Sequence, residues 1–390
     1  MSNHVVLGAG PVGRAIVQSL VSREIDVTVV SRSGTEVLGA RSIAASVLDT
    51  DRLKEIVAGA DAVYQASQPE YHRWPEEFPA MQDSIVRAVR DSGAVLVAVE
   101  NLYGYGPVKG PMSESLPLVA TGRKGKVRSD MWRSLESESK AGRLKVTAGR
   151  ASDFFGPFAE GSAVGDRFFL PLIAGKKAEV MGNPDALHSY TYVKDFGEAL
   201  VRLALDESSL GRAWHVPNAP AVSNRKFLET AAAIAGVQPQ SKNLGLMMMK
   251  IGGLFIPAAR ELPEVLYEFT EDFVVDHSDY TSTFGDHATA LNESLSETID
   301  WWRSHKHEAR QCLPLCLGCI NQWWRASLWS QHTVAGVRRP GLVAVRRGVG
   351  GCGNMERQLR CCTSGHCACE RWCRHRPQAR LTPQLSRGRM

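Results

Sequence analysis

The sequence predicts an α/β protein built on a doubly wound parallel β-sheet, and two observations support this fold class. An apolar run, Val5-Val6-Leu7, leads directly into a glycine-rich turn and then into a segment of helical periodicity. Strand-like and helix-like segments then alternate along roughly the first 150 residues. Such alternation is typical of a parallel sheet covered by helices on both faces, with ligands bound beyond the carboxyl ends of its strands.

The predicted elements follow one another in a regular order. Residues 11–23 place apolar side chains on one helical face. Further strands are expected at 26–30, 42–47, 61–66, 94–99 and 144–147, and further helices at 51–59, 81–91 and 124–141. A later helix is expected at 196–205, with Asp195 as its N-cap.

Three regions are predicted. Residues 1–150 form the sheet domain, residues 151–308 form a smaller substrate lobe interleaved with the last strands, and residues 311–390 form a tail. The tail holds thirteen arginines, no lysine and two acidic residues, a net charge of +11, whereas residues 1–310 carry a net charge of −6. All nine cysteines lie in the tail.

The composition of the tail admits three interpretations. Its arginines and tryptophans could bind nucleic acid, and its thiols could bind zinc. The single C-x-x-C, Cys316 to Cys319, lacks a second such pair, which argues against zinc. We favour a third interpretation, that the tail is the translation of an altered reading frame and is disordered, because it lacks patterned apolar residues. We therefore predict no metal site and no nucleic-acid partner.

The glycine-rich turn reads Gly8-Ala9-Gly10-Pro11-Val12-Gly13 and matches G-x-G-x-x-G. The first glycine permits the tight turn, the second lets the backbone approach a pyrophosphate, and the third lets helix and strand pack closely. The phosphates would lie on the free N–H groups of the helix N-terminus. The turn therefore predicts a dinucleotide-binding Rossmann domain, with Gly8, Gly10, Pro11, Val12 and Gly13 at the cofactor.

The end of the second strand indicates which dinucleotide. It reads Val30-Ser31-Arg32-Ser33, with no acidic residue to accept from an adenosine 2′-hydroxyl. An arginine beside hydroxyl groups suits a 2′-phosphate. We therefore favour NADP(H), with Ser31 and Arg32 as ligands, and keep NAD(H) as the alternative. Arg32 as a solvated loop charge is the competing interpretation.

Nothing at the amino terminus is typical of a signal peptide, and the apolar stretch 244–259 is short and interrupted by glycine and proline. We expect a cytoplasmic protein with a small-molecule substrate and no membrane partner.

Several motifs in sequence order resemble the extended short-chain dehydrogenase/reductases, in the NAD-dependent epimerase/dehydratase branch. They are the glycine turn, Leu48-Asp49, the run 64–67, the run Leu102-Tyr103-Gly104-Tyr105-Gly106-Pro107, the run 150–157 and the run 188–195. The resemblance implies that Leu48 and Asp49 contact the adenine and that Ala66 and Ser67 lie along the cofactor. It also implies a homodimer through the helices at 81–91 and 125–141.

The chain departs from this family where the chemistry is done. The family uses a serine, a tyrosine and a lysine four residues after the tyrosine. Here the serine position reads Glu100-Asn101. Lys124 stands at the tyrosine position, and Arg128 stands at the lysine position. The usual catalytic tyrosine is therefore absent.

Three hypotheses follow. In the first, Lys124 donates the proton, with its pKa lowered by the neighbouring cations Arg123, Lys126 and Arg128; Arg128 holds ribose hydroxyls and Asn101 holds a substrate oxygen. In the second, Tyr103 or Tyr105 supplies the phenol. In the third, no hydride chemistry occurs and the protein is an NADP(H)-binding sensor. We expect NADPH-dependent reduction or isomerisation of a small carbonyl or sugar-like substrate, and the sensor is the alternative.

Overall fold

The computed structural model describes residues 2–244 and 263–305, and the chain up to Arg303 packs as one compact unit. Its centre is a seven-stranded parallel sheet in the order β11-β6-β5-β4-β1-β2-β3. The strands are β1 (Asn3–Leu7), β2 (Asp26–Ser31), β3 (Arg41–Ala44), β4 (Ala62–Gln65), β5 (Val95–Asn101), β6 (Lys145–Ala151) and β11 (Ala213–His215). The predicted doubly wound fold is confirmed.

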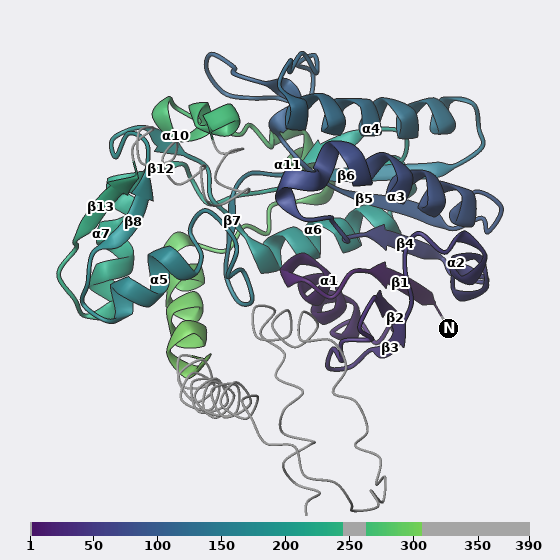
Figure 1. The fold of residues 1–390 in the computed structure, drawn as a ribbon, viewed down its shortest axis with the longest axis horizontal. Helices are drawn as coiled ribbons and strands as arrows, with labels where there is room; N and C mark the ends of the chain where they lie inside the picture. Colours follow the sequence, from purple (N-terminus) through teal and green to yellow (C-terminus); the bar gives the residue numbers. More distant parts are fainter. Residues whose placement is uncertain (1, 245–262, 306–390) are drawn as a thin grey trace, which may run out of the picture. The chain divides into compact units, whose positions relative to one another are not determined.

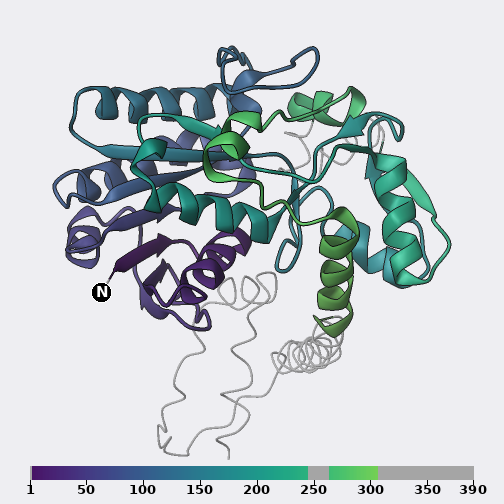
Figure 2. The same ribbon diagram turned by 180° about the vertical axis from the view of Figure 1, so that it is seen from behind.

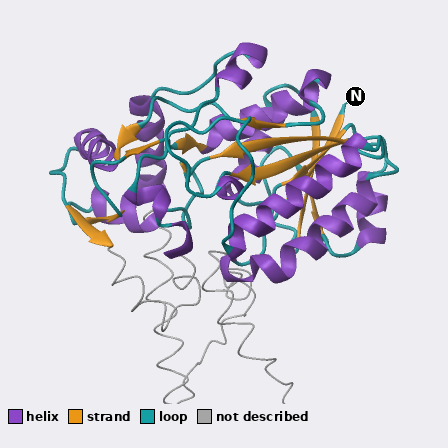
Figure 3. Ribbon diagram, turned by 90° about the horizontal axis from the view of Figure 1, so that it is seen from above, coloured by secondary structure: helices purple, strands orange, loops and turns teal. Residues whose placement is uncertain are grey.

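Helices cover both faces of the sheet (Figure 1). Five of them connect its strands: α1 (Pro11–Val21), α2 (Thr50–Val57), α3 (Trp74–Val89), α4 (Arg123–Lys140) and α6 (Val193–Leu205). Helices α1 and α6 pack together on one face, where Val6 of β1 points, and α2, α3 and α4 cover the other, where Val5 and Leu7 point. The period-2 alternation of a strand thus supplies two separate cores. Figure 3 shows the strands in orange flanked by these helices.

A smaller lobe follows β6. It contains β7 (Phe154–Phe155), α5 (Asp166–Ile173), β8 (Ala178–Met181), β9 (Leu187–His188), β10 (Thr191–Tyr192), β12 (Val222–Ser223), α7 (Asn224–Ala235), β13 (Ser241–Leu244) and α10 (Tyr267–Thr270). Its strands form two-stranded pairs, and a third core built around Phe155, Phe168 and Phe227 packs α5 and α7 together. Figure 2 shows these elements from behind. The chain then returns to the sheet as α11 (Ser278–Phe284), which contacts β11.

Two predicted helix starts differ from the structure. Helix α3 begins at Trp74 rather than residue 81 and continues through Pro79, because the buried Trp74 and Phe78 hold its first turns in place. Helix α6 begins at Val193, so Asp195 is not its N-cap. Asp195 lies buried in the first turn and accepts hydrogen bonds from Thr289, at 2.8 Å from its N–H and 2.7 Å from its hydroxyl. The predictions for residues 311–390 lie outside the described residues.

Candidate active site

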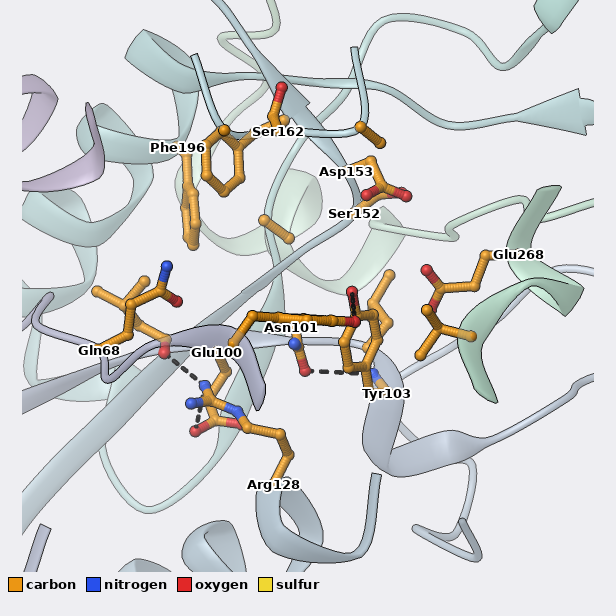
Figure 4. Close-up of a pocket in the computed structure, with 18 of the residues that line it drawn as sticks. Gln68, Glu100, Asn101, Tyr103, Arg128, Ser152, Asp153, Ser162, Phe196 and Glu268 are labelled. Carbon is orange, nitrogen blue, oxygen red and sulfur yellow. Dashed lines mark hydrogen bonds and ion pairs between the residues drawn. The ribbon is translucent and has the colours of Figure 1, made fainter. Parts of the chain in front are cut away.

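A cavity of about 380 Å³ lies at the carboxyl ends of the central strands (Figure 4). Gln65, Asn101 and Ala151 are the last residues of β4, β5 and β6, and all three line the cavity. The remaining lining comes from the start of α3, from α4 and from the lobe. Its aromatic members are Tyr71, Trp74, Phe78, Tyr103, Phe154, Phe196, Phe269 and Phe273. A largely apolar cavity with a few polar groups at this edge of a parallel sheet is the expected place for a ligand.

The glycine turn lies beside this cavity, since the backbone of Gly8 approaches Ala66 and Ser67, which line it. Gly8 has a φ of +124°, and a Cβ there would lie 2.8 Å from the backbone of both residues. A Cβ on Gly13 would lie 2.0 Å from the carbonyl oxygen of Gly8. A Cβ on Gly10 would meet no atom within 4 Å. Gly8 and Gly13 are therefore required by the turn itself, whereas Gly10 faces open space.

The start of α1 fits the pyrophosphate of a dinucleotide. The N-cap is Gly10, so no side chain caps the first N–H groups of the helix. Pro11 lies in the first turn, which holds no acidic residue. The helix N-terminus therefore offers backbone N–H groups and the positive end of its dipole to the open space at Gly10. Nearby, the hydroxyl group of Ser67 is buried and, within the described ranges, has no hydrogen-bond partner. The cofactor contacts predicted for Gly8, Gly10, Pro11, Val12, Gly13, Ala66 and Ser67 stay predictions.

The residues predicted at the adenosine end lie after β2 and β3. Arg32 is exposed, and among residues 2–244 and 263–305 it makes no hydrogen bond or ion pair. Ser31 accepts a hydrogen bond from the Thr35 N–H at 2.9 Å. Leu48 is 59% exposed, and Asp49 caps α2 by accepting from the Arg52 N–H at 3.1 Å. Arg32 is thus open to an anion, while Ser31 and Asp49 also stabilise local backbone.

Of the two candidate tyrosines, Tyr103 lines the cavity. Its hydroxyl group accepts a hydrogen bond from the Tyr71 hydroxyl at 3.4 Å, and its N–H donates to Asn101 Oδ1 at 3.3 Å. Burial raises the pKa of Tyr103 well above its ordinary value, so the phenol is protonated at neutral pH. Asn101 and Tyr103 are therefore brought together, and the amide nitrogen of Asn101 remains as a donor.

Tyr105 is committed elsewhere. It is fully buried, is absent from the described cavity lining and lies between Arg150, which donates to its hydroxyl at 2.6 Å, and His215 Nε2 at 2.8 Å. His215 Nδ1 lies 2.8 Å from the carbonyl oxygen of Asp276 and must donate to it, so Nε2 accepts from Tyr105. Burial lowers the pKa of His215 to about 4, which keeps this tautomer neutral.

Lys124 does not line the cavity in the described part of the chain. Its side chain is fully buried, and its Nζ donates to the carbonyl oxygen of Tyr71 and lies 3.9 Å from the centroid of the Tyr71 ring. The cations expected to crowd Lys124 each face an acid: Arg123 faces Glu76, Lys126 faces Asp130 and Arg128 faces Glu100. The structure thus places Lys124 behind Tyr71, where its charge is stabilised by an aromatic ring.

Arg128 lines the cavity but its fork is engaged. One terminal nitrogen lies 2.9 Å from Glu100 Oε1 and donates to the carbonyl oxygen of Val99 at 2.6 Å. Its Nε is buried and has no hydrogen-bond partner in the part of the chain that the structure describes. The contact of Arg128 with ribose hydroxyls stays a prediction.

Two acidic residues on the lobe side of the cavity, Asp153 and Glu268, were not among the predicted site residues. His188 Nε2 lies 3.2 Å from Asp153 Oδ2, and its Nδ1 lies 2.9 Å from the carbonyl oxygen of Glu268. Glu268 is 1% exposed, and its pKa lies well above its ordinary value. Burial is the larger cause and the charge of Asp153 is the second. Asp153 stands in the run 150–157, but Glu268 stands in no motif.

The described residues hold no group of histidine, cysteine and acidic side chains suited to a metal ion. None of their helices is both long enough and apolar enough to cross a membrane.

Comparisons agree with this geometry. The model of the NAD dependent epimerase/dehydratase family matches residues 4–216, more than half of the chain. A search of curated proteins gave no match.

Three solved structures illustrate the likeness. Bordetella bronchiseptica WbmH in complex with NAD+ is 19% identical, with a TM-score of 0.61, over 78% of this chain and 99% of that chain. UDP-glucuronic acid 4-epimerase from Bacillus cereus in complex with NAD is 15% identical, with a TM-score of 0.62, over 77% and 99%. dTDP-glucose 4,6-dehydratase from Bacillus anthracis in complex with NAD is 13% identical, with a TM-score of 0.65, over 79% and 98%. They share the fold.

Proposed function

Because this chain belongs to the NAD-dependent epimerase/dehydratase family, we propose that it is a nicotinamide-dependent oxidoreductase or epimerase that acts on a small carbonyl or sugar-like substrate through a site without the usual tyrosine. One observation carries the proposal: a single cavity brings Asn101 and Tyr103 beside Ala66 and Ser67, next to the glycine turn. When bound, the cofactor supplies hydride exchange at its nicotinamide ring.

The chain's own residues divide the remaining work. The backbone of Gly10 and the start of α1 hold the phosphates. The Tyr103 hydroxyl transfers a proton to or from a substrate oxygen, and the Asn101 amide donates a hydrogen bond to the same oxygen. Tyr71 donates to the Tyr103 hydroxyl, and Lys124 lies against the face of the Tyr71 ring. Lys124 is therefore a positioning residue in this mechanism.

The test is turnover of NADPH with a panel of aldehydes and ketones. Tyr103→Phe is expected to lower kcat by at least a hundredfold and to leave the Kd for NADPH within twofold of the wild type. Asn101→Ala is expected to raise KM and lower kcat. If Tyr103→Phe turns over at the wild-type rate, the phenol does not move the proton.

We favour NADP(H) over NAD(H). The support is Arg32, which lies exposed after β2 and, within the described residues, has no competing ion pair. Arg32→Ala is expected to weaken NADPH binding at least tenfold and NADH binding less than twofold. An equal loss for both cofactors would contradict the 2′-phosphate contact.

A second candidate function is an NADP(H)-binding sensor. It is favoured by the placement of Lys124 away from the described cavity lining and by the ion pair that engages Arg128. A sensor would bind NADP+ and NADPH with different affinities and turn over none of the carbonyl panel. A homodimer through α3 and α4 and a cytoplasmic location stay predictions, and the first is tested by light scattering of the purified chain.

A further inference from the structure

The lobe wall of the cavity is acidic. Asp153 and Glu268 both line it, and Figure 4 shows Glu268 projecting toward the cavity on the same side as Asp153. The Glu268 side chain is 1% exposed, and its Oε1 has no hydrogen-bond partner among the described residues. A buried carboxyl oxygen without a partner is costly, so a ligand that supplied a donor there would be stabilised.

The two cationic side chains of the described lining already face acids. Arg128 pairs with Glu100 at 2.9 Å, and Arg167 lies 3.6 Å from Glu179. An anionic substrate group would therefore compete with these carboxylates, whereas a cation would meet an unpartnered carboxyl oxygen.

An independent observation also indicates a polar ligand at this wall. Ser152 lines the cavity and is only 6% exposed, and no described residue hydrogen-bonds to its buried hydroxyl group. Phe154 and Phe269 also line the cavity, and the Phe269 ring stacks on that of His188 with 5.0 Å between centroids. Aromatic rings beside a bound organic cation stabilise it.

A cation bound at this wall is expected to change the protonation of Glu268. His188 Nδ1 donates to the carbonyl oxygen of Glu268, which directs its Nε2 toward Asp153 Oδ2 at 3.2 Å. Burial, followed by the charge of Asp153, raises the pKa of Glu268 and so favours its neutral form in the free protein. A cation bound beside it would favour the carboxylate, and the proton would pass to solvent.

We propose that this wall binds an ammonium group, and that the small carbonyl or sugar-like substrate of the cavity carries an amine rather than a phosphate. Glu268 is the anchor, Asp153 adds attraction, and the Ser152 hydroxyl accepts one N–H of the ammonium. The proposal rests on the proposed function only in that the same cavity takes the substrate.

Three probes of similar shape, benzylamine, benzyl alcohol and benzoate, test the proposal. Their binding to the full chain at pH 7 is measured by isothermal titration calorimetry. Benzylamine is expected to bind at least tenfold more tightly than benzyl alcohol, and benzoate is expected to bind more weakly than either. Benzylamine alone is expected to release a proton, which is measured as a difference in heat between Tris and phosphate buffers. Equal affinity for amine and alcohol, or no proton release, would overturn the proposal.

A matched pair of variants locates the anchor. Glu268→Gln is expected to reduce the affinity for benzylamine to that for benzyl alcohol and to abolish proton release. Glu271→Gln removes an acid from an exposed position three residues away and is expected to change neither. A Glu268→Gln protein that keeps the amine preference contradicts the assignment, and the wild-type proton release decides the question if that variant does not fold.

The proposed function can fail separately. A protein that prefers benzylamine but turns over no carbonyl with NADPH would retain this inference and lose the enzymatic assignment. A protein that reduces neutral carbonyls and shows no amine preference would do the reverse.

Discussion

The guanidinium of Arg128 lies 2.9 Å from the carboxylate of Glu100, and both side chains are almost wholly buried. Glu100 immediately precedes Asn101 at the end of β5, and Arg128 reaches it from α4. The same guanidinium donates to the carbonyl oxygen of Val99. This pair and hydrogen bond therefore hold α4 against the strand that carries Asn101.

Removing one partner of this pair should destabilise the protein strongly. Arg128→Met leaves the Glu100 carboxylate buried without its cation and is expected to lower the free energy of unfolding by about 3–5 kcal/mol, measured by urea titration. The double variant Glu100→Gln/Arg128→Met should regain part of this loss. Arg87→Met, which breaks the exposed pair with Asp83, should cost less than about 1 kcal/mol. An equal cost for Arg87→Met and Arg128→Met would contradict the role of burial.

Lys124 and Lys126 form a second comparison on one helix. Lys124→Met removes the buried donor to the Tyr71 carbonyl and is expected to lower the free energy of unfolding by about 1–3 kcal/mol. Lys126→Met removes an exposed pair with Asp130 and is expected to cost about 0.5 kcal/mol or less. Fluorescence titration should give both variants the wild-type affinity for NADPH. A wild-type stability for Lys124→Met would show that this ammonium is dispensable to the fold.

Gly10 and Gly13 separate binding from folding. Gly13→Ala brings a Cβ to 2.0 Å from backbone and should lower the melting temperature, with loss of cofactor binding. Gly10→Ala meets no protein atom within 4 Å, so its melting temperature without cofactor should stay near that of the wild type. Its Cβ fills the space that a pyrophosphate would approach, so NADPH affinity should fall at least tenfold. Unchanged affinity in Gly10→Ala would place the phosphates elsewhere.

Asp195 should make stability fall as pH rises. Burial raises its pKa to about 6, while the hydrogen bonds from Thr289 oppose the shift. Because the folded protein then binds this proton more tightly than the unfolded chain, the contribution of Asp195 to stability falls between about pH 4 and pH 6. Urea titrations should show that the free energy of unfolding falls from pH 4 to pH 7. The fall should be smaller in Asp195→Asn than in the wild type, and the difference between the two should be at most about 3 kcal/mol. The same slope in both proteins would exclude Asp195 as its source.

The sheet could be predicted because its signals are local. The apolar run of β1, the glycine turn and the alternation up to β6 depend on neighbours in sequence, and the structure reproduces them within a few residues, apart from the early start of α3. That start depends on the burial of Trp74 and Phe78. The sequence pattern around Pro79 does not predict this burial.

The site could be predicted only in part. Asn101 and Tyr103 follow a strand end and do line the cavity, but the sequence could not show that Lys124 turns toward Tyr71 or that Arg128 meets Glu100. Glu268 reaches the cavity because a segment far along the chain returns beside Asp153, and this depends on tertiary packing alone.

The pairing of β11 with β6 has a consequence for folding. Ala213 registers against Ala148, so the sheet gains its last strand only after the intervening lobe segment has looped out and returned. Closing so long a loop carries an entropic cost that precedes any favourable contact of β11. We therefore expect β11 to pair with β6 late in folding. The strands around the glycine turn would form first, and the lobe wall of the cavity would assemble last.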